Sequence, residues 1–304
     1  GQSQSANFGL VRDPARMADK FCFVQLSDTH VTDSRETIQT MMEDVATVNR
    51  LSDTPLFVLV SGDLTNRGTR PEEMRGYLEA IANTKYPFYN GVGNHDYGGT
   101  YWDTEHYERI LGPRYYSFDC GRYHFISKDI IARERDKPAY ERQQKWIEED
   151  LRVNGQGKRV IVFQHYIPTN PELEWWSDHN TAAIFSGHWH GRREQNYKGI
   201  LDVNSATLRF GGIDRSPRGF RIIHVDGDQL RCEWRVGEQN KHVEVIHPQV
   251  NGEVSGDKID LLVLAYDTAV RVKTVRYRIF DHKPSAGTAA PEPLSEGTLT
   301  QQSG

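Results

Sequence analysis

The chain has 304 residues, of which 37% are hydrophobic and 11% aromatic, and its formal net charge is −5 at pH 7. This composition excludes a disordered chain, and the length suits one large domain with a smaller one. The small net charge and the absence of basic runs argue against nucleic-acid binding. No apolar stretch is long enough for a transmembrane segment. The sequence does not indicate the oligomeric state. The three cysteines, Cys22, Cys120 and Cys232, lie far apart, which argues against a disulfide framework.

The chain begins at Gly1 without Met and continues with a polar segment. This start suggests a trimmed chain from which a signal peptide has been removed. A bacterial extracytoplasmic location, periplasmic or secreted, is therefore favoured over a cytoplasmic one.

Short apolar runs rich in Val, Ile and Phe alternate with segments of helical spacing in the first 190 residues. Helices are expected over 38–51, after Pro71 and over 140–151, whereas 97–114 and 166–181 are expected to be loops. The apolar runs, which predict buried strands, are 21–26, 56–60, 87–89, 160–163 and 182–185.

Later segments are predicted to be β-rich. A hairpin is expected around Cys120-Gly121, and a second one is expected around Asp226-Gly227-Asp228. Alternating strands are expected over 259–266 and 270–279, which suggests a partial immunoglobulin-like or fibronectin-like appendage. The tail from 284 to 304, rich in Pro, Ser, Thr and Gly, is expected to be poorly ordered.

Polar clusters containing Asp, Asn or His close each of the five predicted buried strands. Sites of open α/β sheets lie at the carboxyl ends of strands, so these clusters should converge on one rim. The two-residue spacing of each Asp-x-His or His-x-His pair would place both side chains on one side of an extended backbone. Three glycines (62, 93 and 187) stand where backbone must approach the site closely. The clusters are Asp28-Thr29-His30, Gly62-Asp63, Gly93-Asn94-His95-Asp96, Gln164-His165 and Gly187-His188-Trp189-His190.

This mixture of carboxylate, imidazole and amide donors without cysteine points to metal ions, with Mn, Fe or Zn preferred. A lone Asp-x-His or Gly-Asp is usually structural, but five clusters in order behind five strands argue against chance. Seven donors exceed one tetrahedral zinc and suit two ions, about 3.5–4 Å apart, that share one carboxylate. The seven candidate ligands are Asp28, His30, Asp63, Asn94, His165, His188 and His190.

The motif series resembles the calcineurin-like metallophosphoesterases over about residues 20–235. Within that superfamily, the residues around its motifs most resemble those of the cyclic-nucleotide phosphodiesterase-like bacterial phosphohydrolases. The resemblance implies a four-layer α/β/β/α sandwich over 21–238, preceded by a segment over 1–20 and followed by the small β segment and flexible tail over 239–304. It implies one metal held by Asp28, His30, Asp63 and His190, and a second held by Asp63, Asn94, His165 and His188.

The resemblance further implies hydrolysis of a small-molecule phosphate ester by in-line attack of a metal-bridging hydroxide, with His95 as the acid for the leaving group. The family's protein phosphatases place an Asp where this chain has Asn66, whose amide could orient His95 without offering a negative charge. Purple acid phosphatases have a tyrosine ligand a few residues after the bridging aspartate, and they are disfavoured because the residues directly after Asp63 are Leu64-Thr65-Asn66-Arg67.

A phosphodiester is favoured over a phosphomonoester because aromatic residues near the clusters outnumber cations and could stack an aryl or nucleoside group. The alternatives are a phosphomonoesterase of the same superfamily, or a non-catalytic metal-binding or scaffold protein on this fold. Packing of the loops is an equally open role for these aromatics, and Arg192 and Arg193 could bind a second phosphate or be solvated. The aromatic residues are Tyr97, Tyr101, Trp102, Tyr166, Trp175, Trp176 and Trp189.

Overall fold

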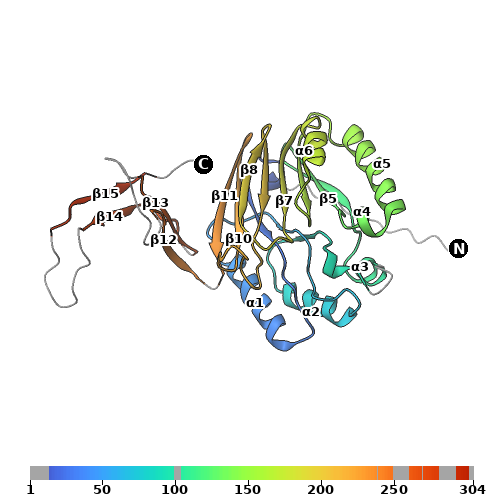
Figure 1. The fold of residues 1–304 in the computed structure, drawn as a ribbon, viewed down its shortest axis with the longest axis horizontal. Helices are drawn as coiled ribbons and strands as arrows, with labels where there is room; N and C mark the ends of the chain where they lie inside the picture. The colour runs from blue at the N-terminus through green and yellow to red at the C-terminus, as the bar shows by residue number, and fades with distance from the viewer. Residues whose placement is uncertain are drawn as a thin grey trace.

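The computed structural model describes residues 14–98, 104–237, 239–248, 260–268, 270–280 and 292–300. Two β-sheets pack back to back, and helices cover their outer faces (Figure 1). The predicted α/β sandwich is therefore confirmed. No helix within the described ranges is long and apolar enough to cross a membrane.

The first sheet has five strands in the order β11-β10-β1-β2-β3. Its strands β1, β2 and β3 run parallel to one another, and β10 and β11 continue the sheet antiparallel. Helices α1 (Arg35–Asn49) and α2 (Pro71–Ile81) pack their apolar faces against it, as their spacing predicts. The strand bounds are β1 Lys20–Leu26, β2 Val58–Val60, β3 Phe88–Asn90, β10 Gly219–Asp226 and β11 Gln229–Val236.

The second sheet has six strands in the order β4-β5-β6-β7-β9-β8. Helices α5 (Lys137–Val153) and α6 (Asn170–Ser177) cover its outer face, and the short α4 (Ala132–Arg135) leads into α5. The strand bounds are β4 Tyr116–Cys120, β5 Tyr123–Lys128, β6 Arg159–Gln164, β7 Thr181–Ser186, β8 Arg193–Tyr197 and β9 Ile200–Asn204.

Phenylalanine rings fill the space between the two sheets. The Phe23 and Phe57 rings stack at 5.2 Å, and Phe125 meets both of them edge-on. Each fully buried ring of this kind contributes roughly 1.5–3 kcal/mol. The central strands are buried on both faces, which is why the predicted strands read as continuous apolar runs.

Two segments expected to be loops contain helices. Helix α3 (Glu105–Ile110) lies within 97–114, and α6 lies within 166–181. Helix α6 begins with a capping box, because Glu172 accepts hydrogen bonds from the backbone N–H and the hydroxyl of Thr169. The Thr-x-x-Glu signature followed by an apolar run is visible in the sequence, so this helix was predictable.

The C-terminal region contains two separate antiparallel pairs. Strand β12 (Lys241–His247) pairs with β13 (Leu262–Asp267), and β14 (Val275–Ile279) pairs with β15 (Ser295–Leu299). The expected strand over 270–279 therefore begins only at residue 275. Strand β15 lies in the tail expected to be poorly ordered, and backbone pairing with β14 orders it despite its polar composition. Of that expected tail, residues 292–300 are described, and 284–291 and 301–304 lie outside the described residues.

Strand β13 docks on the large sandwich through Tyr266, which is 4% exposed. Its hydroxyl accepts a hydrogen bond from the backbone N–H of Val236 and donates to the carbonyl of the same residue. The Arg235 guanidinium lies 4.4 Å from the centre of the Tyr266 ring. This aromatic side chain therefore ties the C-terminal region to the last strand of the first sheet.

Candidate metal centre

The predicted ligands come together at the carboxyl ends of parallel strands from both sheets. Asp28 and His30 follow β1, and Asp63 follows β2. The other four follow strands of either sheet: Asn94 lies on the turn η2 (Asn94–Asp96) after β3, His165 follows β6, and His188 and His190 follow β7. All except His188, His190 and Asn94 are buried.

Five of these seven residues have a left-handed backbone, with φ values of 53° at Asp28, 43° at His30, 51° at Asp63, 67° at His188 and 45° at His190. The sequence-based expectation of an extended backbone at the Asp-x-His and His-x-His pairs is therefore wrong. Such conformations cost of order 1–3 kcal/mol each, and they persist only where the surroundings hold them. Here the first two turns hold each other, since the Asp28 N–H donates to the Gly62 carbonyl and the His30 N–H donates to that of Asp63.

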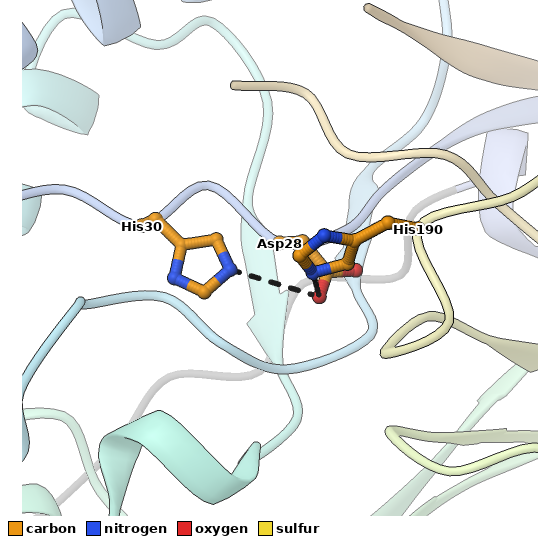
Figure 2. Close-up of side chains that lie close together, drawn as sticks. All are labelled: Asp28, His30 and His190. Atoms are coloured by element: carbon orange, nitrogen blue, oxygen red, sulfur yellow. Dashed lines mark ion pairs between the residues drawn. The ribbon is translucent and has the colours of Figure 1, made fainter. Parts of the chain in front are cut away.

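One candidate cluster consists of Asp28, His30 and His190 (Figure 2). The Nε2 atom of His190 lies 3.2 Å from Asp28 Oδ1, and Nε2 of His30 lies 3.9 Å from the same oxygen. His30 Nε2 is also 3.8 Å from Asp63 Oδ2. Both ring nitrogens of His30 are buried, and neither finds a hydrogen-bond partner in the described part of the chain. A buried imidazole of this kind fits a metal ligand, because a bound ion would satisfy the polar atom.

A second cluster consists of Asp63, His165 and His188. The Nε2 atom of His165 lies 3.1 Å from Asp63 Oδ2 and 3.0 Å from the amide oxygen of Asn94. The Nδ1 atom of His165 lies 2.8 Å from the Ser61 carbonyl, which acts as the acceptor and leaves the Nε2 lone pair for a ligand. Asp63 thus lies between the two clusters, as a shared carboxylate would.

Burial and charge act in opposite directions on these groups. Burial lowers the pKa of His30 to about 4, so this ring is neutral at pH 7. Burial also disfavours protonation of His165, but the Asp63 carboxylate outweighs it and raises the His165 pKa to about 9. In return, burial would raise the pKa of Asp63, yet His165 holds it well below the usual range. The site therefore favours positive charge beside Asp63, whether a proton or a metal ion.

Asp96 is a buried carboxylate near the candidate ligands. It accepts hydrogen bonds from the backbone N–H groups of Leu64, Thr65 and Gly93, at 3.2, 2.9 and 2.9 Å. Burial, together with the Asp63 charge, raises its pKa to about 7. The sequence places Asp96 within a recognised cluster, but only the structure shows that it joins the loops after β2 and β3.

His95 is anchored at two points and keeps an exposed ring. Its backbone N–H donates to Asp63 Oδ1 at 2.8 Å, and its Nδ1 lies 2.8 Å from the backbone carbonyl of Asn66. This contact from Asn66 is thus made by the main chain, whereas the sequence predicts the side-chain amide in this role. His95 also forms a group with His30 and Asp63 whose ligand atoms lie within 4.8 Å of one another.

Two glycines permit the close approach of the loops. A Cβ atom at Gly93 would lie 2.9 Å from the Asp63 Cα and would overlap the Asp63 amide nitrogen and Oδ1. A Cβ atom at Gly187 would overlap the Ser27 hydroxyl and an Asp28 carboxylate oxygen. Neither glycine has a positive φ, so close approach rather than backbone conformation requires a glycine there.

Three of the seven aromatic residues expected around the site pack within the protein. Tyr97 is buried and donates its hydroxyl to Asp129 at 2.6 Å, Trp176 is 1% exposed in the core, and Trp175 stacks on His179 at 3.9 Å. The remaining members are Tyr166, whose ring centre lies 4.3 Å from that of His188, Trp189, which is 62% exposed, and Tyr101 and Trp102, which lie outside the described residues.

The paired arginines after the last cluster are engaged within the protein. Arg193 forms an ion pair with Asp202. The Arg192 guanidinium lies 4.7 Å from the centre of the Trp234 ring, and its backbone N–H donates to Asp214. Neither arginine is therefore simply solvated.

The sequence model described as calcineurin-like phosphoesterase matches residues 22–192, which is more than half of the chain. A comparison with curated protein sequences found no match.

Among solved structures, a purple acid phosphatase from yellow lupin (Lupinus luteus) seeds is similar, with a TM-score of 0.57 and 15% identity over 83% of this chain and 55% of that chain. The chain therefore spans little more than half of that phosphatase. GAP50, described as the anchor in the inner membrane complex of Plasmodium, has a TM-score of 0.55 and 13% identity over 83% of this chain and 91% of that chain. At these identities the similarity concerns the fold.

Proposed function

The chain belongs to the calcineurin-like phosphoesterase family, and from that premise we propose that it hydrolyses a small phosphodiester at a centre of two metal ions. It is a metal-dependent phosphoester hydrolase. The observation that carries the two-ion proposal is the position of Asp63, whose Oδ2 lies near His30 Nε2 on one side and near His165 Nε2 on the other. A single carboxylate between two histidine-containing clusters is the arrangement of a bridging ligand.

We assign Asp28, His30 and His190 to one ion, Asn94, His165 and His188 to the other, and Asp63 to both. When bound, the ions supply positive charge that polarises a phosphate oxygen and lowers the pKa of a water. The protein's part is to fix the ligands, and the Ser61 carbonyl does so for His165 by holding its Nδ1–H.

We assign to His95 the proton given to the leaving oxygen. With Nδ1 held by the Asn66 carbonyl, a protonated ring presents Nε2–H as its remaining donor. The backbone contact to Asp63 keeps this ring at a fixed position beside the clusters. His95 therefore combines an exposed ring with a fixed backbone, which suits a general acid better than a buried ligand.

The finer choice of a diester rests on aromatic surface beside the clusters, represented by Tyr166 against His188. The measurement is the ratio of catalytic efficiencies for bis-(p-nitrophenyl) phosphate and p-nitrophenyl phosphate at the same pH, with Mn²⁺, Fe²⁺ or Zn²⁺ supplied. A preference for the diester supports the proposal, and a preference for the monoester assigns the phosphomonoesterase alternative.

The two-ion assignment is tested with Asp63→Asn, which keeps the shape of the side chain and removes its charge. We expect the variant to lose both metals together, by elemental analysis, and to lose hydrolysis. Asp226→Asn is the control, because that carboxylate lies on the surface in a pair with Lys20. One metal per chain at saturation in the unmodified protein would contradict the dinuclear proposal. Two bound metals without hydrolysis of any ester would favour a non-catalytic scaffold.

A further inference from the structure

Three exposed apolar side chains lie on loops that adjoin the candidate metal ligands. In the sandwich as described, residues 14–98 and 104–237, the three most exposed large hydrophobic side chains are Ile213 (80%), Phe210 (64%) and Trp189 (62%). Trp189 lies between the proposed ligands His188 and His190 in the sequence, and the other two lie on the loop from 205 to 218. Single exposed apolar residues are normal on a protein surface, but a gathering at a catalytic rim marks a binding surface.

Phe210 is placed directly against a proposed metal ligand. Its ring centre lies 5.5 Å from that of His30, with the two planes tilted by 41°. His30 is only 3% exposed, whereas most of the Phe210 side chain remains open to solvent. An aromatic ring packed on a ligand and open on its other side is a platform for a second ring.

The loop that carries Phe210 and Ile213 is held to the ligand loop by hydrogen bonds. The backbone N–H of Ile213 donates to the carbonyl of His190 at 2.6 Å, and Asp214 accepts from the backbone N–H of Arg192 at 2.8 Å. Asp214 also accepts from the backbone and hydroxyl of Ser216, which closes the loop on itself. The apolar residues are therefore fixed relative to the clusters before any substrate arrives, which limits the entropy lost on binding.

Arg209 places a positive charge beside the Phe210 ring. The Arg209 guanidinium lies 5.6 Å from the centre of the Phe210 ring, and no carboxylate within the described ranges forms an ion pair with it. An arginine beside an aromatic ring favours the binding of a flat, electron-rich ring, because that ring can stack on both the guanidinium plane and the aromatic side chain.

We propose that Phe210 binds an aromatic group of the substrate, an aryl or nucleobase ring, while the phosphate occupies the metal centre, and that the exposed Trp189 and Ile213 extend this apolar surface. This inference rests on the proposed function and adds to it the chemical class of the ester group. Phe210 is a specificity residue in this scheme: it contacts the organic part of the substrate and takes no part in bond breaking.

The test compares the binding of phenylphosphonate and methylphosphonate to the full-length, Mn²⁺-loaded protein by calorimetry. Both probes carry the same phosphonate group and differ only in the ring. We expect the unmodified protein to prefer phenylphosphonate, and Phe210→Ala to reduce that preference roughly tenfold, within the range measured for a base stacked on an aromatic side chain. Phe210→Trp should keep the preference, and Phe210→Leu should lose it.

Val153→Ala is the matched control, since Val153 is an exposed apolar residue on α5, away from the predicted ligands. It should leave the ratio of the two dissociation constants unchanged. A ratio that Phe210→Ala does not alter, or that Phe210→Leu preserves, would overturn the aromatic assignment. Hydrolysis of bis-(p-nitrophenyl) phosphate by the unmodified protein is measured separately, so a failure of the proposed function is distinguished from a failure of this inference.

Discussion

Gly93→Ala adds one methyl group at a close approach between the loops after β2 and β3. The backbone at Gly93 has φ −112° and ψ 176°, which any residue adopts, so the substitution introduces no conformational strain of its own. The new Cβ would overlap the Asp63 amide nitrogen and Oδ1 and would lie 2.9 Å from the Asp63 Cα. Real Cβ atoms essentially never lie closer than 3.0 Å to such neighbours, so the Asp63 turn must move.

The expected cost follows from this overlap. Overpacking by one methyl group costs about 1–3 kcal/mol of folding free energy. Displacement of an atom that positions a metal ligand should also lower the metal affinity, by roughly 10- to 100-fold. Because Asp63 is assigned to both ions, we expect both affinities to fall, together with the rate of phosphoester hydrolysis.

Gly191→Ala is a control in the neighbouring ligand loop. A Cβ there would meet its nearest atom, the Trp189 carbonyl oxygen, at 3.6 Å, which is ordinary van der Waals contact. Its free energy of unfolding should change by less than about 0.5 kcal/mol, and metal content should stay the same. The assays are chemical denaturation and metal titration of both variants. Equal metal affinity in Gly93→Ala and Gly191→Ala would refute the argument that close approach positions Asp63.

Three further outcomes are expected. His95→Gln should keep both metals and lose roughly 10²–10⁴ in turnover on alkyl esters, but less on p-nitrophenyl esters, whose leaving group needs no proton; loss of metal would contradict the acid role. Since Asp63 raises the pKa of His165 to about 9, metal binding must release that proton, so Mn²⁺ affinity should rise with pH from 7 to 9 and level off above it. In the metal-free protein the same raised pKa stabilises the fold fully below about pH 6.5, and this contribution is lost as the pH rises through about 9; a flat pH dependence of the Mn²⁺ dissociation constant would contradict this reasoning. Tyr266→Phe should lower the free energy of unfolding by about 1–3 kcal/mol, because the buried N–H of Val236 loses its acceptor, and should leave the metal content unchanged.

The family and the sandwich could be predicted because their signals are local and repeated. Each central strand is buried on both faces, so its sequence is a continuous apolar run, and each run ends in a polar cluster. Strand β8 is one of the strands after residue 190 that the sequence did not predict. Its sequence, Arg193–Tyr197, is polar and mostly exposed, and its backbone pairs with β9. Strand β15 was missed for the same reason, since β14 supplies its hydrogen bonds.

The sequence by itself determined which chemical groups stand at the strand ends, because donor type and order along the chain are properties of the residues. Only the tertiary structure decided how those groups are held: the left-handed turn at Asp28, the main-chain contact from Asn66 to His95, and the role of Asp96 all depend on pairing between loops remote in sequence. The structure also moved Trp176 into the core and brought Phe210 against His30, although their residue types alone suggest no such difference. The physical reason is that burial and close contact depend on which segments the two sheets bring together. A local sequence pattern does not indicate which remote segments will lie next to it.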